Sequence, residues 1–101
     1  MKVDFDKPFI DCFGREINAP KGGKNIAEQL CLLLFNLNTM CNTPLTGDEK
    51  YAAYKLCNRI SANPAEVELS TEEASLIKRL SGEVFNAGPY GQIVDIIENN
   101  N

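Results

Sequence analysis

Four cysteines, Cys12, Cys31, Cys41 and Cys57, are the most reactive side chains of this chain of 101 residues, which contains no histidine. None of them forms a Cys-x-x-Cys pair, the spacing typical of zinc sites built on sulfur. A nucleophilic cysteine usually relies on a histidine base, and Cys12, at the tip of an expected hairpin, would be the most exposed candidate. We therefore expect free thiols, no bound metal and no catalytic cysteine.

The remaining candidate chemistry has simpler explanations. Glu72 and Glu73 suit the first turn of a helix, and Glu28 suits a helix cap, so neither site predicts acid–base catalysis. Residues 21–24, Lys-Gly-Gly-Lys, precede a helix as a phosphate-binding loop would. They lack the four residues between glycines and the Lys-Ser/Thr pair that such a loop needs. We expect no cofactor and no enzymatic activity.

The distribution of charge disfavours nucleic acid as a partner. The net charge is −4, and residues 66–101 carry seven acidic side chains against two basic ones. An acidic surface repels phosphate and gains nothing from counterion release. The third and fourth predicted helices resemble a helix-turn-helix in outline, but the fourth has no basic residue to present to DNA. We expect these to be two packed core helices.

Composition and hydropathy predict one folded domain in a reducing compartment. Apolar residues make up 44% of the chain and charged residues 24%, which is ordinary globular usage. The longest apolar run, residues 30–35, is far shorter than the roughly 20 residues of a membrane-spanning helix. The N-terminus has no secretory pattern. We expect a cytoplasmic protein that does not contact membranes.

The N-terminal part predicts a β-hairpin or small meander over residues 3–17. Val3 and Phe5 alternate with charged residues, as in a strand with one buried face. Asp11 and Gly14 occupy the first and fourth positions of a type I turn, with the glycine in the left-handed region. Further along, residues 67–69 are expected to be extended and to form a short edge strand.

Three capping signals open the first three predicted helices: Asn25, Thr46 and Ser70 each precede a glutamate by three residues. Pro89 fits the first position of a fourth helix. We expect the first helix over residues 26 to 37 or 38, a second that opens at the Thr46 capping box and is ended by Asn63-Pro64, a third over about 71–86, and a fourth from Pro89 to about residue 98. The loop between the first two should be polar.

The first predicted helix is apolar on every side, unlike the others. A helix of this kind must be covered on most sides, so it is either the centre of the core or part of an oligomer interface. The later helices each carry one apolar stripe. In the third and fourth helices the stripes contain Ala74, Leu76, Ile77, Leu80 and Val84, and then Tyr90, Ile93, Val94 and Ile97.

Aromatic side chains are the best candidates for an interaction surface. Phe13, Tyr51, Tyr54 and Tyr90, with Phe35, exceed what so small a core obviously needs. Aromatic residues are enriched at protein–protein interfaces, although they also fill ordinary cores. We name Phe13, Tyr51, Tyr54 and Tyr90 as the candidate interaction residues.

Three segments resemble known sequences: residues 1–9 followed by Asp11-x-x-Gly14-x-Glu16-Ile17, the run 67–78, and the tail 89–98. They are similar to small uncharacterised proteins of tailed phages and prophages. The motifs are a turn, a helix cap and a helix start, so no functional residues follow from them. The resemblance implies a phage-derived protein in the cytoplasm of a bacterial host.

These observations predict an α+β fold in which an N-terminal β-hairpin packs on three or four helices, with the first helix central. The single domain should divide into hairpin and loop (1–24), helical part (25–98) and frayed tail (99–101). The expected function is that of a non-enzymatic accessory or regulatory protein that contacts a host or phage protein. The alternatives are a virion structural or assembly protein that forms homo-oligomers and, less favoured, a small nucleic-acid-binding protein.

Overall fold

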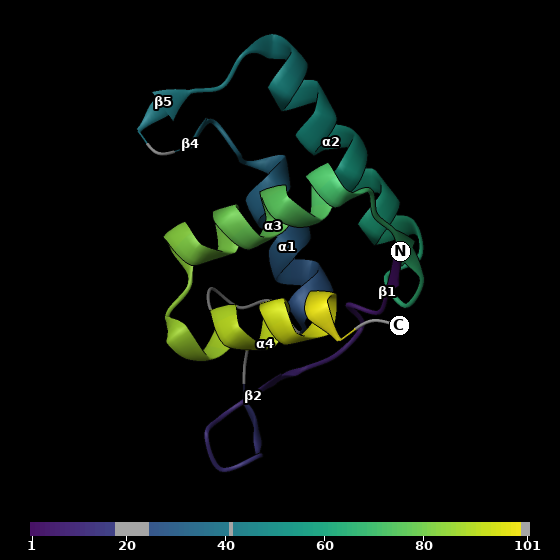
Figure 1. Ribbon diagram of the computed structural model, residues 1–101, viewed down its shortest axis with the longest axis vertical. Helices are drawn as coiled ribbons and strands as arrows, with labels where there is room; N and C mark the ends of the chain where they lie inside the picture. Colours follow the sequence, from purple (N-terminus) through teal and green to yellow (C-terminus); the bar gives the residue numbers. More distant parts are fainter. Residues whose placement is uncertain (18–24, 41, 100–101) are drawn as a thin grey trace.

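The computed structural model describes residues 1–17, 25–40 and 42–99, and this part of the chain forms an α+β domain as predicted. Its principal extents are 41 × 27 × 21 Å. Helices α1 and α2 form one layer, helices α3 and α4 pack across it, and a hairpin projects from the lower end (Figure 1). The predicted loop at residues 18–24, Cys41, and residues 100 and 101 of the tail lie outside the described residues.

The N-terminal strand β1 (Lys2–Val3) pairs with β6 (Val67–Glu68), in antiparallel register with Val3 opposite Val67. The prediction of a meander that includes β1 was therefore wrong, whereas the short strand at residues 67–69 is confirmed. Backbone hydrogen bonds continue beyond the strand: the Phe5 N–H donates to the Pro64 carbonyl (2.8 Å) and the Phe5 carbonyl accepts from Ala27 (3.0 Å). The segment thus ties α1 to the end of α2.

The predicted hairpin forms from β2 (Phe9–Ile10) and β3 (Glu16–Ile17). Its turn has the expected hydrogen bond from the Gly14 N–H to the Asp11 carbonyl (3.0 Å), and Gly14 has a φ of 83°, which favours glycine. Phe9, at the base of the hairpin, is buried in the core. Its ring meets the Phe85 ring edge-on, with the two ring centroids 5.9 Å apart.

Helix α1 (Ile26–Phe35) begins where predicted, and its Asn25 side chain accepts from the Glu28 N–H at 2.9 Å. It ends two or three residues earlier than predicted, at a C-cap on Asn36. The following polar segment is not a plain loop, because β4 (Thr39–Met40) pairs with β5 (Thr43–Pro44). Asn42 supplies the left-handed conformation of this turn, with a φ of 62°.

Helices α2 (Gly47–Ala62) and α3 (Thr71–Val84) both begin with the reciprocal capping boxes that the sequence predicts. Arg59 joins the two helices through a hydrogen bond to the Glu68 carbonyl (3.0 Å) and an ion pair with the Glu73 carboxylate (2.7 Å). Helix α3 ends at Val84, two residues before the predicted end, and Val84 is exposed rather than on the inner face.

Helix α4 (Ala87–Glu98) begins two residues before the predicted start, so Pro89 is the third residue of the helix rather than the first. Proline is tolerated there because the N–H groups of the first turn have no partner within the helix. Helix α4 runs back along α3, and Lys78 pairs with Glu98 across the two helices.

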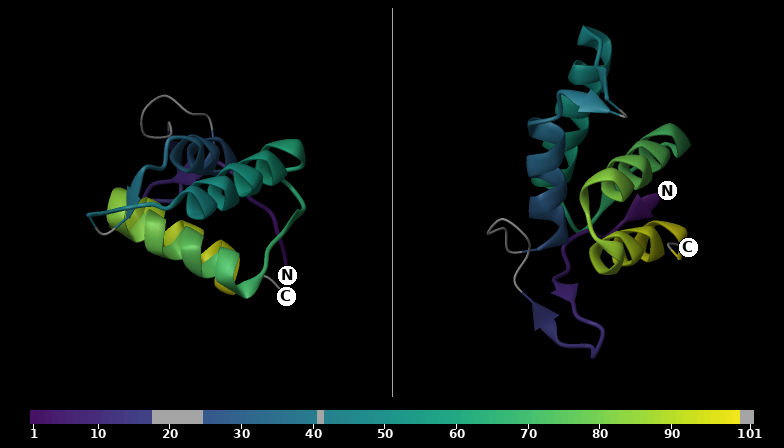
Figure 2. Two further views of the ribbon diagram at one scale, coloured as in Figure 1. Left: turned by 90° about the horizontal axis from the view of Figure 1, so that it is seen from above. Right: turned by 90° about the vertical axis from the view of Figure 1, so that its left-hand side faces the viewer.

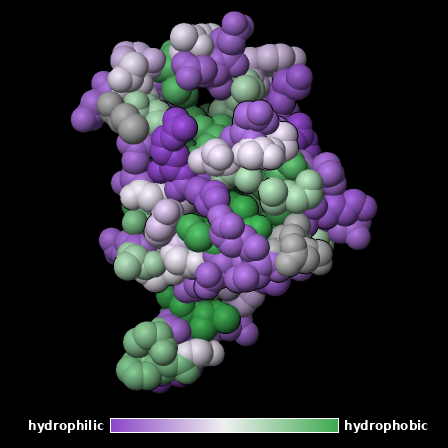
Figure 3. Space-filling view, in the orientation of Figure 1, coloured by the Kyte–Doolittle hydropathy of each residue, from purple (hydrophilic) through white to green (hydrophobic). Residues whose placement is uncertain are grey.

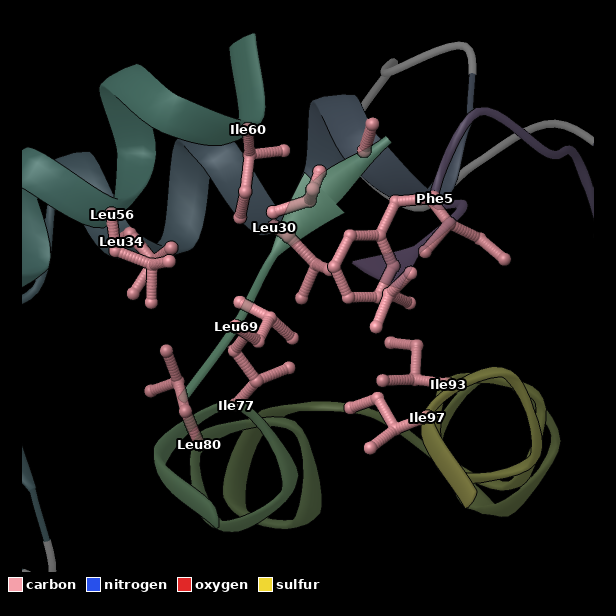
Figure 4. Close-up of a cluster of buried hydrophobic side chains, with 14 of the residues drawn as sticks. Phe5, Leu30, Leu34, Leu56, Ile60, Leu69, Ile77, Leu80, Ile93 and Ile97 are labelled. Atoms are coloured by element: carbon pink, nitrogen blue, oxygen red, sulfur yellow. The ribbon is translucent and has the colours of Figure 1, made fainter. Parts of the chain in front are cut away.

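One hydrophobic core joins the four helices with β1, β2 and β6. Phe5 lies between α1 and α4, Leu34 faces Leu56, and the apolar stripes of α3 and α4 close the cluster from below (Figure 4). Burial of each large side chain stabilises the fold by roughly 1.5–3 kcal/mol. The fully buried members include Val3, Phe5, Phe9, Ile26, Leu30, Leu56, Ile60, Val67, Ile77 and Ile93.

Candidate interaction surface

The four predicted interaction residues lie in three separate places. Phe13 is at the hairpin tip and is 77% exposed, at the opposite end of the molecule from the start of α2 (Figure 1). Tyr51 and Tyr54 are exposed on α2 and stack with ring centroids 6.3 Å apart. Tyr90 covers Gly82, where an added Cβ would lie 3.3 Å from the tyrosine ring. The structure therefore brings only Tyr51 and Tyr54 together.

The hairpin tip is held by Asp11. Its Oδ1 accepts from the N–H groups of Phe13 (2.8 Å) and Arg15 (3.0 Å), and its Oδ2 accepts from Arg15 Nε (3.2 Å). These bonds, the Arg15 backbone first, lower the pKa of Asp11. The Arg15 guanidinium also lies 5.1 Å from the centre of the Phe13 ring. A charged side chain of the hairpin itself therefore lies against the exposed Phe13 ring, above a turn that Asp11 holds.

A groove, about 540 Å³ in volume, lies at the other end of the molecule between α1, α3 and the β4–β5 hairpin. The right-hand panel of Figure 2 views this side of the molecule and shows α1 and α3 next to each other, with the β4–β5 hairpin above them. The apolar side chains that line the groove are Leu32, Leu33, Leu37, Leu80 and Val84.

Helix α1 supplies Gln29, Leu32 and Leu33 to this lining, and it is covered by the core on one side only. Ile26, Leu30 and Leu34 are buried, as expected for a central helix, whereas Leu32 is 47% exposed and Phe35 is 65% exposed. Leu32 and Phe35 are three residues apart and so lie on one helix face. We call the groove lining together with Phe35 the groove surface.

A polar side chain is buried beneath this surface. Gln29 lines the groove and is only 2% exposed. Its Nε2 has no hydrogen-bond partner among the residues that the structure describes. A buried amide left without a partner costs about 1–3 kcal/mol, so native proteins rarely keep one without a reason.

The sequence also lacks charge along this part of the chain. From Gln29 to Gly47, 19 residues, there is no acidic or basic side chain, although such residues make up 24% of the whole chain. Among the described residues that line the groove, Glu83 alone is charged. On the face shown in Figure 3, by contrast, purple hydrophilic side chains separate most of the hydrophobic ones. Depletion of charge is a mark of interface cores.

The cysteines that the structure describes are free, as predicted. Cys12 is exposed at the hairpin tip. Cys31 and Cys57 meet between α1 and α2, where each thiol donates to the carbonyl of the other residue, at 3.7 and 3.4 Å. Burial, and then the neighbouring Cys57, raises the pKa of Cys31 to about 12. A thiol with so high a pKa is a poor nucleophile at neutral pH.

No cluster suited to a metal ion is present among the described residues. Within the same ranges, no helix has both the length and the apolar character needed to cross a membrane. The predicted glycine-rich loop at residues 21–24 lies outside the described part of the chain.

Sequence reasoning named Phe35 as an excess aromatic but missed Leu32, Val84 and Gln29. Gln29 and Leu32 lie in the uncharged run from Gln29 to Gly47, which the sequence shows directly, but this run does not include Val84 and does not show which face of the helix is left open. Comparisons with protein-family models, with curated proteins and with solved structures found no match to this chain.

Proposed function

We propose that this chain is a small non-enzymatic accessory protein that acts by protein–protein contact through its groove surface. The observation that carries the proposal is the groove itself, which exposes Leu32 and Val84 around a hollow with almost no charge. Exposed apolar side chains in one concave, charge-poor place are typical of binding surfaces.

The proposed setting is the cytoplasm of a bacterial host. The resemblance of the two chain ends to phage and prophage proteins supports this setting, as does a free-thiol chemistry suited to a reducing compartment. The partner is then a protein of the host or of the phage. The acidic balance of residues 66–101 favours protein over nucleic acid as the partner.

A pull-down from bacterial lysate with matched variants tests the proposal. Leu32→Ser and Phe35→Ser change exposed side chains of the groove surface, and Phe13→Ser changes an equally apolar side chain at the hairpin tip. We expect the same protein to be recovered with wild type and Phe13→Ser, and to be lost with both groove variants. Recovery that none of the three substitutions changes would contradict the proposal.

Self-assembly is the second candidate function, as for a virion assembly protein. The exposed Leu32 and Phe35 favour it, because two copies of an acidic chain can meet without repulsion on an uncharged face. Light scattering at increasing protein concentration separates the two functions. A closed ring or larger oligomer that Phe35→Ser dissociates supports assembly, and a monomer at every concentration rejects it.

A further inference from the structure

The groove has the size and lining of a binding site for part of another molecule rather than for a flat surface. Its volume of about 540 Å³ falls within the range of small-ligand pockets. Leu33 and Leu80 form apolar walls, and the exposed Leu32 and Val84 form its rim. Such a space suits one or two large apolar side chains.

Gln29 gives this apolar space a specific polar requirement. Its amide nitrogen is a donor with no partner in the described structure, and its side chain belongs to the groove lining. The terminal torsion of glutamine is broad, so binding requires the amide to rotate about it until the buried N–H points into the groove. A carbonyl oxygen placed there would satisfy the donor, as a peptide backbone does when it enters a groove.

The charges around the groove limit the sequence of such a peptide. The uncharged run from Gln29 to Gly47 offers no ion pair to a charged occupant. Glu83, at the rim, repels acidic side chains. A charged side chain would therefore lose hydration in the groove without gaining a partner along the α1 side.

We infer that the groove binds an uncharged, apolar peptide segment of the partner protein, with a large side chain between Leu33 and Leu80 and a backbone carbonyl that accepts from Gln29 Nε2. The inference rests on the proposed function and adds the class of ligand. The hydrogen bond from Gln29 fixes the position of the bound segment in the groove, and Leu33 and Leu80 supply most of the apolar contact.

Titration of ¹⁵N-labelled protein with a capped tripeptide, acetyl-Leu-Phe-Leu-amide, tests the inference by NMR. We expect a dissociation constant of about 1 mM, because burial of the apolar side chains supplies most of the affinity and the hydrogen bond to Gln29 adds to it. The shifts should fall on the Gln29 side-chain amide and on the backbone amides of Leu33 and Leu80. Gln29→Met, which keeps the length of the side chain and removes the donor, should weaken binding about fivefold.

Two comparison peptides and one control variant decide the outcome. The inference holds if acetyl-Glu-Phe-Glu-amide and acetyl-Lys-Phe-Lys-amide bind more weakly and Phe13→Ser binds as wild type does. It is overturned if either charged peptide binds better, if Gln29→Met has no effect, or if no shift is seen at these groups. It is also overturned if the same shifts grow with protein concentration alone, because a second copy then fills the groove.

The two proposals can fail separately. If Leu32→Ser and Phe35→Ser still lose the protein captured from lysate while the tripeptide does not bind, only the ligand class is wrong. If the tripeptide binds as expected while all variants capture the same protein, the groove is a peptide site but does not mediate that contact.

Discussion

The two ends of the molecule both expose large apolar side chains, but they do so in different surroundings. At the lower end Phe13 projects from a turn whose backbone is held by Asp11 and whose ring is covered in part by Arg15. At the upper end Leu32 borders a groove whose lining is nearly without charge, and the exposed Phe35 lies on the same face of α1. If exposure alone were used to choose a contact residue, Phe13 would be the first choice.

The comparison shows that exposure is a weaker sign of a contact surface than concavity and charge depletion. At the hairpin tip the Asp11 carboxylate accepts hydrogen bonds from the backbone N–H groups of Phe13 and Arg15, and none of the groove-lining residues lies there. The groove surface includes the buried Gln29 Nε2, which has no partner among the described residues and which a bound segment would satisfy. The upper end is therefore the better candidate.

The largest expected effect separates folding from contact within α1. Leu30 is fully buried and Leu32, two residues on, is 47% exposed. Leu30→Ala should lower the free energy of unfolding by about 3 kcal/mol because it leaves a cavity. Leu32→Ala should lower it by about 0.5 kcal/mol or less. Urea denaturation measures both, and a large loss from Leu32→Ala would mean that Leu32 serves the core.

A smaller effect should remain at the hairpin. Gly14→Ala places a Cβ in the left-handed region, at a cost of about 1 kcal/mol, although the added atom meets no neighbour within 4 Å. Hydrogen exchange should quicken at the amides of Phe13 and Arg15 and stay unchanged along α1. Faster exchange in α1 as well would show that the two ends are coupled.

Acid should loosen the hairpin before it affects the groove. Hydrogen bonds from the Arg15 and Phe13 backbone lower the pKa of Asp11. A carboxyl whose folded pKa is depressed stabilises the folded state above its unfolded pKa, near 3.9, and that contribution is lost as pH falls through the folded value. An NMR titration from pH 6 downward should show the Asp11 turn shifting at acid pH, while Leu33 and Leu37 stay fixed.

Glu73 should respond in the same pH range for a related reason. Burial alone raises the pKa of Glu73, but hydrogen bonds from Ser70 and the Arg59 guanidinium outweigh it, so the net pKa is lowered. Stability from this group is complete above about pH 4.3 and falls with its protonation. In Arg59→Met the free energy of unfolding should fall less steeply at acid pH than it does in wild type. An equally steep fall in the variant would argue against this ion pair.

The smallest expected effect concerns the thiols of the two regions. Iodoacetamide at pH 8 should modify Cys12, at the exposed tip, well before Cys31, whose pKa of about 12 keeps it protonated. Peptide mass spectrometry gives the two rates, and the rate at Cys31 should rise about tenfold per pH unit. Equal rates at pH 8 would mean that the α1–α2 contact opens readily.

Local features of the fold followed from the sequence because their causes are local. The turn at Asp11 and Gly14 and the caps at Thr46 and Ser70 depend on residues three or four positions apart. The pairing of β1 with β6 could not be predicted from the sequence. It joins Val3 to Val67, which are far apart in the chain, and neither segment has a pattern that specifies its partner strand.

The groove could not be predicted for a different reason. An all-apolar helix shows no stripe, so its sequence cannot tell which side is covered and which is left for a partner. Only the packing of α2 against Leu30 and Leu34 leaves Leu32 and Phe35 outside. The unpaired amide of Gln29 likewise appears only once its neighbours are placed.

Photo-crosslinking tests the central claim most directly. A benzoylphenylalanine in place of Phe35, or in place of Phe13, keeps an aromatic ring at each end of the molecule and reports which end contacts another protein when the chain is expressed in bacteria. We predict a discrete adduct from position 35 and none from position 13. Adducts from position 13 alone would show that the hairpin tip, and not the groove surface, makes the contact.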